Sequence, residues 1–264
     1  MSYIITTICI GKKFEPIREH WLKKINDTCK TEEIYIIDDN NIKKTDIISY
    51  QYAWWDIVRL NNNIQLCLKK NKPIVHIDMD IIIENEIEEI VNLPYDFIIS
   101  TEIGGDNAFP KECSQKLGFG VCSGFYIIKK ECVNFMIKIL KHMKDRTHKS
   151  FSDQVNIMNY VVNNEYILRE EECLLNGIKF TNKIIEIDNI KICVLDFGII
   201  VRDPIFKKHQ FGNHINIDNV GGVNNFIKYF YEPLENLPLT CRCGKKHLGD
   251  NNICSHISVR NISN

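Results

Sequence analysis

Two carboxylates interrupt a long β-branched stretch of the chain. Residues 73–83 read PIVHIDMDIII, a run typical of a buried strand, with Asp78 and Asp80 in its middle. Because side chains at i and i+2 of a strand point the same way, a strand through this stretch would aim both carboxylates at one point. Two such carboxylates repel each other and lose hydration when they are buried. The pair therefore predicts either a bound hard divalent cation or a site that is open to solvent. The alternative is a strand that ends at Asp78, with both carboxylates solvated in a turn.

The rest of the chain alternates between strand and helix patterns. Strands are predicted at 3–10, 33–37, 96–101 and 120–129, and amphipathic helices at 15–28, 52–70, 131–144 and 152–162. Shorter elements are a helix at 86–91, an irregular loop at 102–118, strands at 166–168, 184–187 and 192–195, and a closing helix at 226–231. This order predicts an α/β fold, in which ligands collect at the carboxyl ends of the strands. We expect Trp54 and Trp55 in the core, although one of them could stack on a base or a sugar.

Composition narrows the class of protein. The 264 residues carry a net charge of −1 and are 44% hydrophobic, which allows a sizeable core and gives no basic footprint for nucleic acid. No stretch is long enough to span a bilayer. Eleven cysteines, an odd number mostly within apolar patterns, favour free buried thiols and a reducing, cytoplasmic location.

The end of the chain differs in composition from the rest. Residues 1–236 read as one domain and residues 237–264 as a Cys/His-containing tail. Its possible zinc ligands are Cys241, Cys243, His247, Cys254 and His256. The Cys-x-Cys opening departs from the usual ligand spacing, so a loosely packed tail without metal is the alternative.

Six short motifs follow one another between residues 3 and 231. They are IITTI at 4–8, Arg59 in the helix before the carboxylates, DMD at 78–80, CSGFY at 122–126, SDQ at 152–154, and a late loop with His214, Asn216 and Gly221-Gly222. In this order they resemble the DxD-containing GT-A fold glycosyltransferases, which use nucleotide-diphospho-sugar donors. Val155 stands where some retaining families carry a second acid, and the late loop lacks a Lys-Pro-Trp ending, so the stereochemical outcome stays open.

The resemblance implies a single-domain α/β fold of the GT-A type, with a Rossmann-like mixed sheet flanked by helices. It implies Mn²⁺, or Mg²⁺, held by Asp78, Asp80 and His214, a nucleotide-sugar donor with a UDP-sugar favoured, and a glycan or protein acceptor. Asp153 would act as the base of an inverting transfer, or Gln154 would stabilise the sugar cation of a retaining one. The other expected donor-binding residues are Thr7, Arg59, Asp78 (through the ribose), Asp106, Asn107, Ser123, Gly124, Asn216, Gly221 and Lys228. The oligomeric state is left open.

Two other functions compete with this interpretation. A phosphatase of the haloacid dehalogenase type would use Asp78 as nucleophile and Asp80 as acid or base, but there the motif normally ends the first strand. A non-catalytic module that binds sugar nucleotides or glycans could have the same fold. Single residues also have plain structural interpretations: His214 as a loop histidine, Arg59 as a solvated helix charge, Asp153 as a helix N-terminal acid and His76 as a satisfied core histidine.

Overall fold

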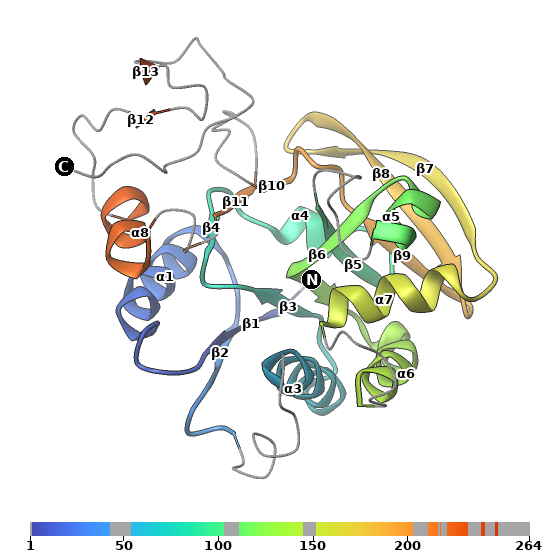
Figure 1. The fold of residues 1–264 in the computed structure, drawn as a ribbon, viewed down its shortest axis with the longest axis horizontal. Helices are drawn as coiled ribbons and strands as arrows, with labels where there is room; N and C mark the ends of the chain where they lie inside the picture. Colours follow the sequence, from blue (N-terminus) through green and yellow to red (C-terminus); the bar gives the residue numbers. More distant parts are fainter. Residues whose placement is uncertain are drawn as a thin grey trace.

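The computed structural model describes residues 2–42, 54–102, 111–144, 152–202, 211–215, 217, 221–231, 239–240 and 246–247. Its centre is a mixed eight-stranded sheet with strand order β2-β1-β3-β6-β5-β9-β8-β7 (Figure 1). The strands are β1 (Ile4–Cys9), β2 (Glu33–Asp38), β3 (Ile74–Ile77), β5 (Phe97–Glu102), β6 (Gly120–Ile128), β7 (Ile167–Leu175), β8 (Ile178–Ile187) and β9 (Ile190–Val194). β1 pairs in parallel with β2 and β3, whereas β6 runs antiparallel to both of its neighbours. The predicted mixed α/β sheet is therefore confirmed.

Helices cover both faces of this sheet. α1 (Glu15–Thr28) and α8 (Val223–Phe230) contact each other on one side (Figure 1). On the other side lie α3 (Trp54–Lys70), α5 (Lys111–Leu117), α6 (Val133–Lys144) and α7 (Asp153–Val162). Adjacent residues of the central strands enter opposite cores, as Ile4 and Ile5 do in β1. This explains why these strands read as continuous apolar runs.

The stretch with the two carboxylates is two strands rather than the single strand predicted. β3 ends at Ile77, and a turn closed by a hydrogen bond from Ile81 N to Asp78 O (3.0 Å) carries the chain out of the large sheet. β4 (Ile81–Ile83) then joins a second sheet of order β10-β11-β4, with β10 at Ile200–Arg202 and β11 at Gly212–His214. Apolar residues resume after the turn because both sheets bury them, so the hydrophobic pattern conceals the break.

Several predicted boundaries were also wrong. The predicted short strands at 166–168 and 184–187 are the ends of a long β7–β8 hairpin. Its two turn residues, Asn176 and Gly177, both have positive φ, the conformation for which an Asn-Gly turn is suited. The predicted loop at 102–118 contains α5, and α8 starts three residues before the predicted helix. The short helix α4 spans Glu88–Val91. Near the end of the chain, two short strands, β12 (Leu239–Thr240) and β13 (Lys246–His247), pair with each other.

The cysteines of the described part of the chain are all free. Seven of them are buried: Cys9, Cys29, Cys67, Cys113, Cys122, Cys132 and Cys193. The eighth, Cys173, is partly buried. The prediction of free buried thiols holds for these residues. The zinc ligands considered in the tail lie outside the described residues, except for His247 in β13. Among the described helices, none combines the length and the apolar character that a membrane crossing needs.

Packing of α6 offers a test of the fold. Phe135 is 2% exposed and meets the ring of Tyr160 from α7 edge-on, with 5.5 Å between the centroids. Phe135→Ala should lower the free energy of unfolding by about 3–5 kcal/mol, because it removes buried contacts and leaves a cavity. Lys141→Ala on the exposed side of the same helix should change it by less than about 0.5 kcal/mol. Urea unfolding measures both, and equal midpoints for the two variants would contradict this packing.

Candidate functional site

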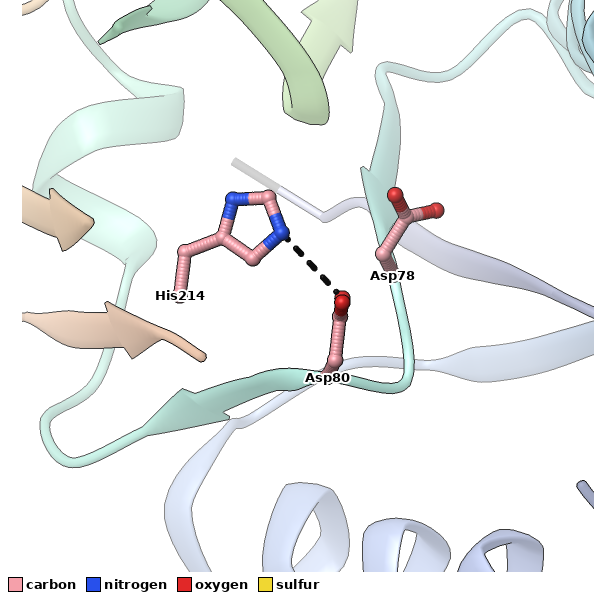
Figure 2. A group of neighbouring side chains, drawn as sticks. All are labelled: Asp78, Asp80 and His214. Carbon is pink, nitrogen blue, oxygen red and sulfur yellow. Dashed lines mark ion pairs between the residues drawn. The ribbon is translucent and has the colours of Figure 1, made fainter. Parts of the chain in front are cut away.

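Asp78, Asp80 and His214 meet where the two sheets join. Each offers one ligand atom, and these atoms lie within 4.8 Å of one another; Figure 2 shows the imidazole directed toward Asp80, with Asp78 on the neighbouring strand end. The backbone fixes this arrangement: Asp78 N donates to Gly124 O at 2.8 Å, and Ile215 N donates to Asp80 O at 2.9 Å. Nε2 of His214 lies 3.3 Å from Oδ1 of Asp80. A residue far along the chain thus joins the Asp-x-Asp turn in a group of side chains that could hold a cation.

Gly124 makes room for this cluster. A Cβ there would lie 2.9 Å from Cε1 of His214 and 3.1 Å from Oδ2 of Asp78. β6 is irregular at this point, because Ile99 of β5 pairs with Tyr126 and the next residue, Ser100, pairs with Cys122. Bulges of this kind often lie beside functional sites, where they redirect side chains.

Arg59 ties the site to two helices. Its guanidinium is 4% exposed, and Nη1 lies 3.1 Å from Oδ1 of Asp78. Nη2 lies 2.9 Å from Oδ1 of Asp56 and 2.7 Å from Oδ2 of Asp153, and it donates to Oγ of Ser123 at 3.1 Å. Arg59 is therefore neither the solvated charge of the plain interpretation nor a free cation. Its donors hold three carboxyl groups together.

His76 supports Asp78 from the core. The ring is fully buried and stacked on Tyr126, its Nε2 lies 2.8 Å from Oδ1 of Asp78, and its Nδ1 lies 3.3 Å from Oγ1 of Thr6. Burial lowers the pKa of His76 despite the nearby Asp78 carboxylate, so the ring is neutral. A neutral ring that donates from Nε2 accepts the Thr6 hydroxyl at Nδ1. The interpretation of His76 as a satisfied core histidine fits these contacts, and its partner is a site residue.

The electrostatics of the cluster differ from one group to the next. Burial acts to raise the pKa of Asp78, but the Arg59 guanidinium and the His76 hydrogen bond outweigh it and lower the pKa to about 2. Burial raises the pKa of Asp56 to about 8, against the opposing effect of Arg59. For His214, burial acts to lower the pKa, but the Cys122 sulfur and the Asp80 carboxylate raise it above the ordinary 6.5. The raised pKa means that the ring holds its second proton more tightly, and a cation binding at Nε2 would have to displace a proton from that atom.

A cavity of about 710 Å³ opens beside these groups. Its polar lining comprises Asp56, Arg59, Asp78, Asp80, Cys122, Ser123, Ser152, Gln154 and His214, and its other lining residues are Ile8, Ile10, Phe14, Trp55, Met79, Gly124 and Ile217. The volume suits a small organic ligand. Trp55 is 46% exposed, so the expectation that it belongs to the core was wrong.

The SDQ motif splits between the core and the cavity. Asp153 is 1% exposed, is paired with Arg59 and is absent from the cavity lining. Gln154 lines the cavity, where its Oε1 lies 3.5 Å from Ser123 N and its Nε2 lies 3.4 Å from Oε2 of Glu102. Of the two predicted catalytic residues, Gln154 is the one placed to touch a ligand.

Other predicted donor-binding residues are scattered. Thr7 is fully buried on β1 and is not part of the cavity lining, although Ile8 beside it is. Gly221, two residues before α8, and Lys228, in the last turn of α8, are exposed, and neither lines the cavity. Asp106, Asn107 and Asn216 lie outside the described residues. Two features of the site were not predicted: Asp56, whose only signal was an acid in the first turn of a helix, and the contact between Cys122 and His214.

Comparisons with known proteins identify the fold. No protein-family model matches the sequence, and no curated protein is detectably similar to it. Among solved structures, mouse xyloside xylosyltransferase 1 matches with 10% identity over 83% of this chain and 99% of its own, at a TM-score of 0.50. An active-site mutant of the galactosyltransferase LgtC matches with 9% identity over 80% of this chain and 86% of its own, at a TM-score of 0.51. The chain has the GT-A fold of these glycosyltransferases, as the order of its motifs predicted.

The buried Asp56 should make stability depend on pH. Its pKa is about 8 in the folded protein against an ordinary 3.8, so between these values the folded protein holds a proton that the unfolded chain releases. Stability contributed by this group therefore falls as the pH rises, by at most about 1.4 kcal/mol per pH unit. Asp56→Asn removes the titration. Relative to this variant, wild-type protein should lose stability between about pH 5 and about pH 7.5 in urea unfolding, and parallel curves would show that Asp56 is ionised when folded.

Proposed function

We propose that this protein is a metal-dependent glycosyltransferase that moves a sugar from a nucleotide-diphosphate sugar, with a UDP-sugar favoured, to a glycan or protein acceptor. The observation that carries the proposal is the convergence of Asp78, Asp80 and His214 beside a ligand-sized cavity in a GT-A fold. In open α/β folds the carboxyl ends of the strands, where this cluster lies, are the usual place for such ligands.

The residues present fit a divalent cation. Three carboxyl groups, those of Asp56, Asp78 and Asp153, surround the Arg59 guanidinium, and Asp80 lies beside His214, so negative charge is in excess even with Asp56 protonated. Two carboxylates with an imidazole suit Mn²⁺ better than Mg²⁺. When bound, such an ion supplies positive charge that stabilises a diphosphate leaving group. Both terminal nitrogens of Arg59 are engaged by carboxylates, so we propose that it serves the donor by holding Asp78 in place.

The cavity suggests how the donor would lie. Its lining includes apolar side chains from the end of β1 and the segment after it, Ile8, Ile10 and Phe14, as well as the carboxylate cluster. We propose that the nucleoside packs on the apolar part while its diphosphate faces Asp78 and Asp80. Gln154 would then contact the sugar near the bond that breaks, and Asp153 would orient Arg59 from behind.

The competing functions fare differently. A phosphatase that uses Asp78 as nucleophile needs a free carboxylate, but Oδ1 of Asp78 is engaged by Arg59 and His76, and the motif follows the third strand of the chain rather than the first. A non-catalytic binding module would show the same contacts. Turnover, and not binding, distinguishes that alternative from the proposed enzyme.

Removing one carboxylate tests the metal. In the presence of Mn²⁺ we expect wild-type protein to hydrolyse a UDP-sugar slowly, and Asp80→Asn to lower that rate at least about 100-fold while leaving the melting temperature without metal nearly unchanged. Asp27→Asn, an exposed carboxylate on α1, is the matched control and should behave as wild type. Rates should be compared across UDP-, GDP- and ADP-sugars. Full turnover by Asp80→Asn would contradict the metal role. If wild-type protein turned over none of these donors, the proposed enzyme activity would be contradicted and the non-catalytic binding module would stand.

Filling the space beside the ligands tests the geometry. Gly124→Ala places a methyl group against His214 and Asp78, so we expect Mn²⁺ affinity to fall at least about tenfold. Gly198→Ala is the control, because its Cβ would also be crowded, at 3.3 Å from Asp196 and Phe180, but would touch neither His214 nor the two carboxylates. Titration of free Mn²⁺ by electron paramagnetic resonance measures both variants. An unchanged affinity for Gly124→Ala would mean that the cation is not held between these two side chains.

A further inference from the structure

The imidazole of His214 is held from three sides. Its Nε2 faces Oδ1 of Asp80 at 3.3 Å, its Nδ1 lies 3.3 Å from Sγ of Cys122, and its Cε1 packs against Gly124, where a Cβ would come within 2.9 Å. Cys122 is 4% exposed and is itself anchored, because its backbone carbonyl accepts a hydrogen bond from Oγ of Ser100 at 2.8 Å. The sulfur therefore contacts His214 from a buried residue of β6 whose backbone is held by a hydrogen bond.

The two ring nitrogens have different tasks. An imidazole that binds a cation through Nε2 must carry its proton on Nδ1, and that N–H needs an acceptor to fix the ring. In most metal sites this acceptor is a carboxylate or a carbonyl oxygen. Among the described residues, the sulfur of Cys122 is the atom that contacts Nδ1 of His214.

A thiol is suited to both states of this ring. Its sulfur accepts the Nδ1 proton when Nε2 is free to bind a cation, and its S–H donates to Nδ1 when Nε2 carries the proton and faces Asp80. The same contact therefore persists with either tautomer. An alanine at this position offers neither a donor nor an acceptor, and it leaves Nδ1 of a buried ring without that partner.

We propose that Cys122 is a positioning residue that holds His214 in the orientation and tautomer needed for cation binding. This rests on the proposed function, since it takes His214 as a metal ligand. It accounts for a buried thiol at the edge of the cavity, and it requires no chemistry at the sulfur itself.

Metal affinity in a set of cysteine variants tests the proposal. Cys122→Ala should raise the Mn²⁺ dissociation constant roughly 10- to 100-fold, as loss of the outer partner of a ligating histidine typically does. Cys122→Ser keeps a donor and acceptor on a shorter arm and should recover part of the affinity. Cys113→Ala is the matched control: that thiol is also 4% exposed and contacts Oδ1 of Asn159 at 3.1 Å, but it does not line the cavity. Its affinity should equal that of wild type.

A second readout reports on the ring directly. In ¹⁵N-histidine-labelled protein without metal, at a pH high enough that the ring is neutral, the tautomer pattern of His214, assigned with a His214→Gln variant, should change in Cys122→Ala and be restored in Cys122→Ser. Thermal unfolding checks that each variant is folded. Wild-type affinity together with an unchanged tautomer in Cys122→Ala would overturn the role of Cys122 while leaving the metal site intact. Failure of wild-type protein to bind Mn²⁺ would overturn both this inference and the proposed function.

Discussion

A single buried guanidinium governs how the site is built. Arg59 is 4% exposed and is shared among Asp56, Asp78 and Asp153, which come from the start of α3, the end of β3 and the start of α7. Removing such a cation would strand buried carboxylates, a loss of about 3–5 kcal/mol in comparable cases. One positive charge cannot balance all the acids around it. Arg59 therefore both joins these elements and leaves a negative excess next to the cavity.

The position of that excess depends on a change of sheet. After Ile77 the chain turns out of the large sheet, and β4 pairs with β11, which sets His214 opposite Ile81 and next to Asp80. The small second sheet therefore brings His214 to the two carboxylates from more than a hundred residues away in sequence. A strand continuing straight through Asp80 would have kept both carboxylates in the large sheet, without this histidine.

The sequence predicts the parts of this structure that local patterns determine. Strands buried on both faces, such as β1 and β6, and helices with a clear apolar period, such as α3 and α6, follow from residue spacing. The break after Ile77 does not, because Ile81–Ile83 is equally apolar in either sheet. β11 has the sequence Gly-Asn-His, which has no strand propensity, and forms through long-range pairing with β4. The convergence of Asp78, Asp80 and His214 was predicted from the order of motifs, whereas the burial of Asp56 and Asp153 depends on Arg59, whose partners only the fold reveals.

Structural similarity to glycosyltransferases at about 10% sequence identity shows the fold alone, so the chemistry must be argued from the site. Clustering carboxylates in a partly buried site lowers the stability of the folded protein. Crowded carboxylates, of which Asp56 is buried with a pKa of about 8, reduce stability, and apolar residues of similar size would pack there without that penalty. Under the proposed function, a cation held between Asp78, Asp80 and His214 would offset part of this repulsion beside the ligand-sized cavity, and its charge would serve the transfer.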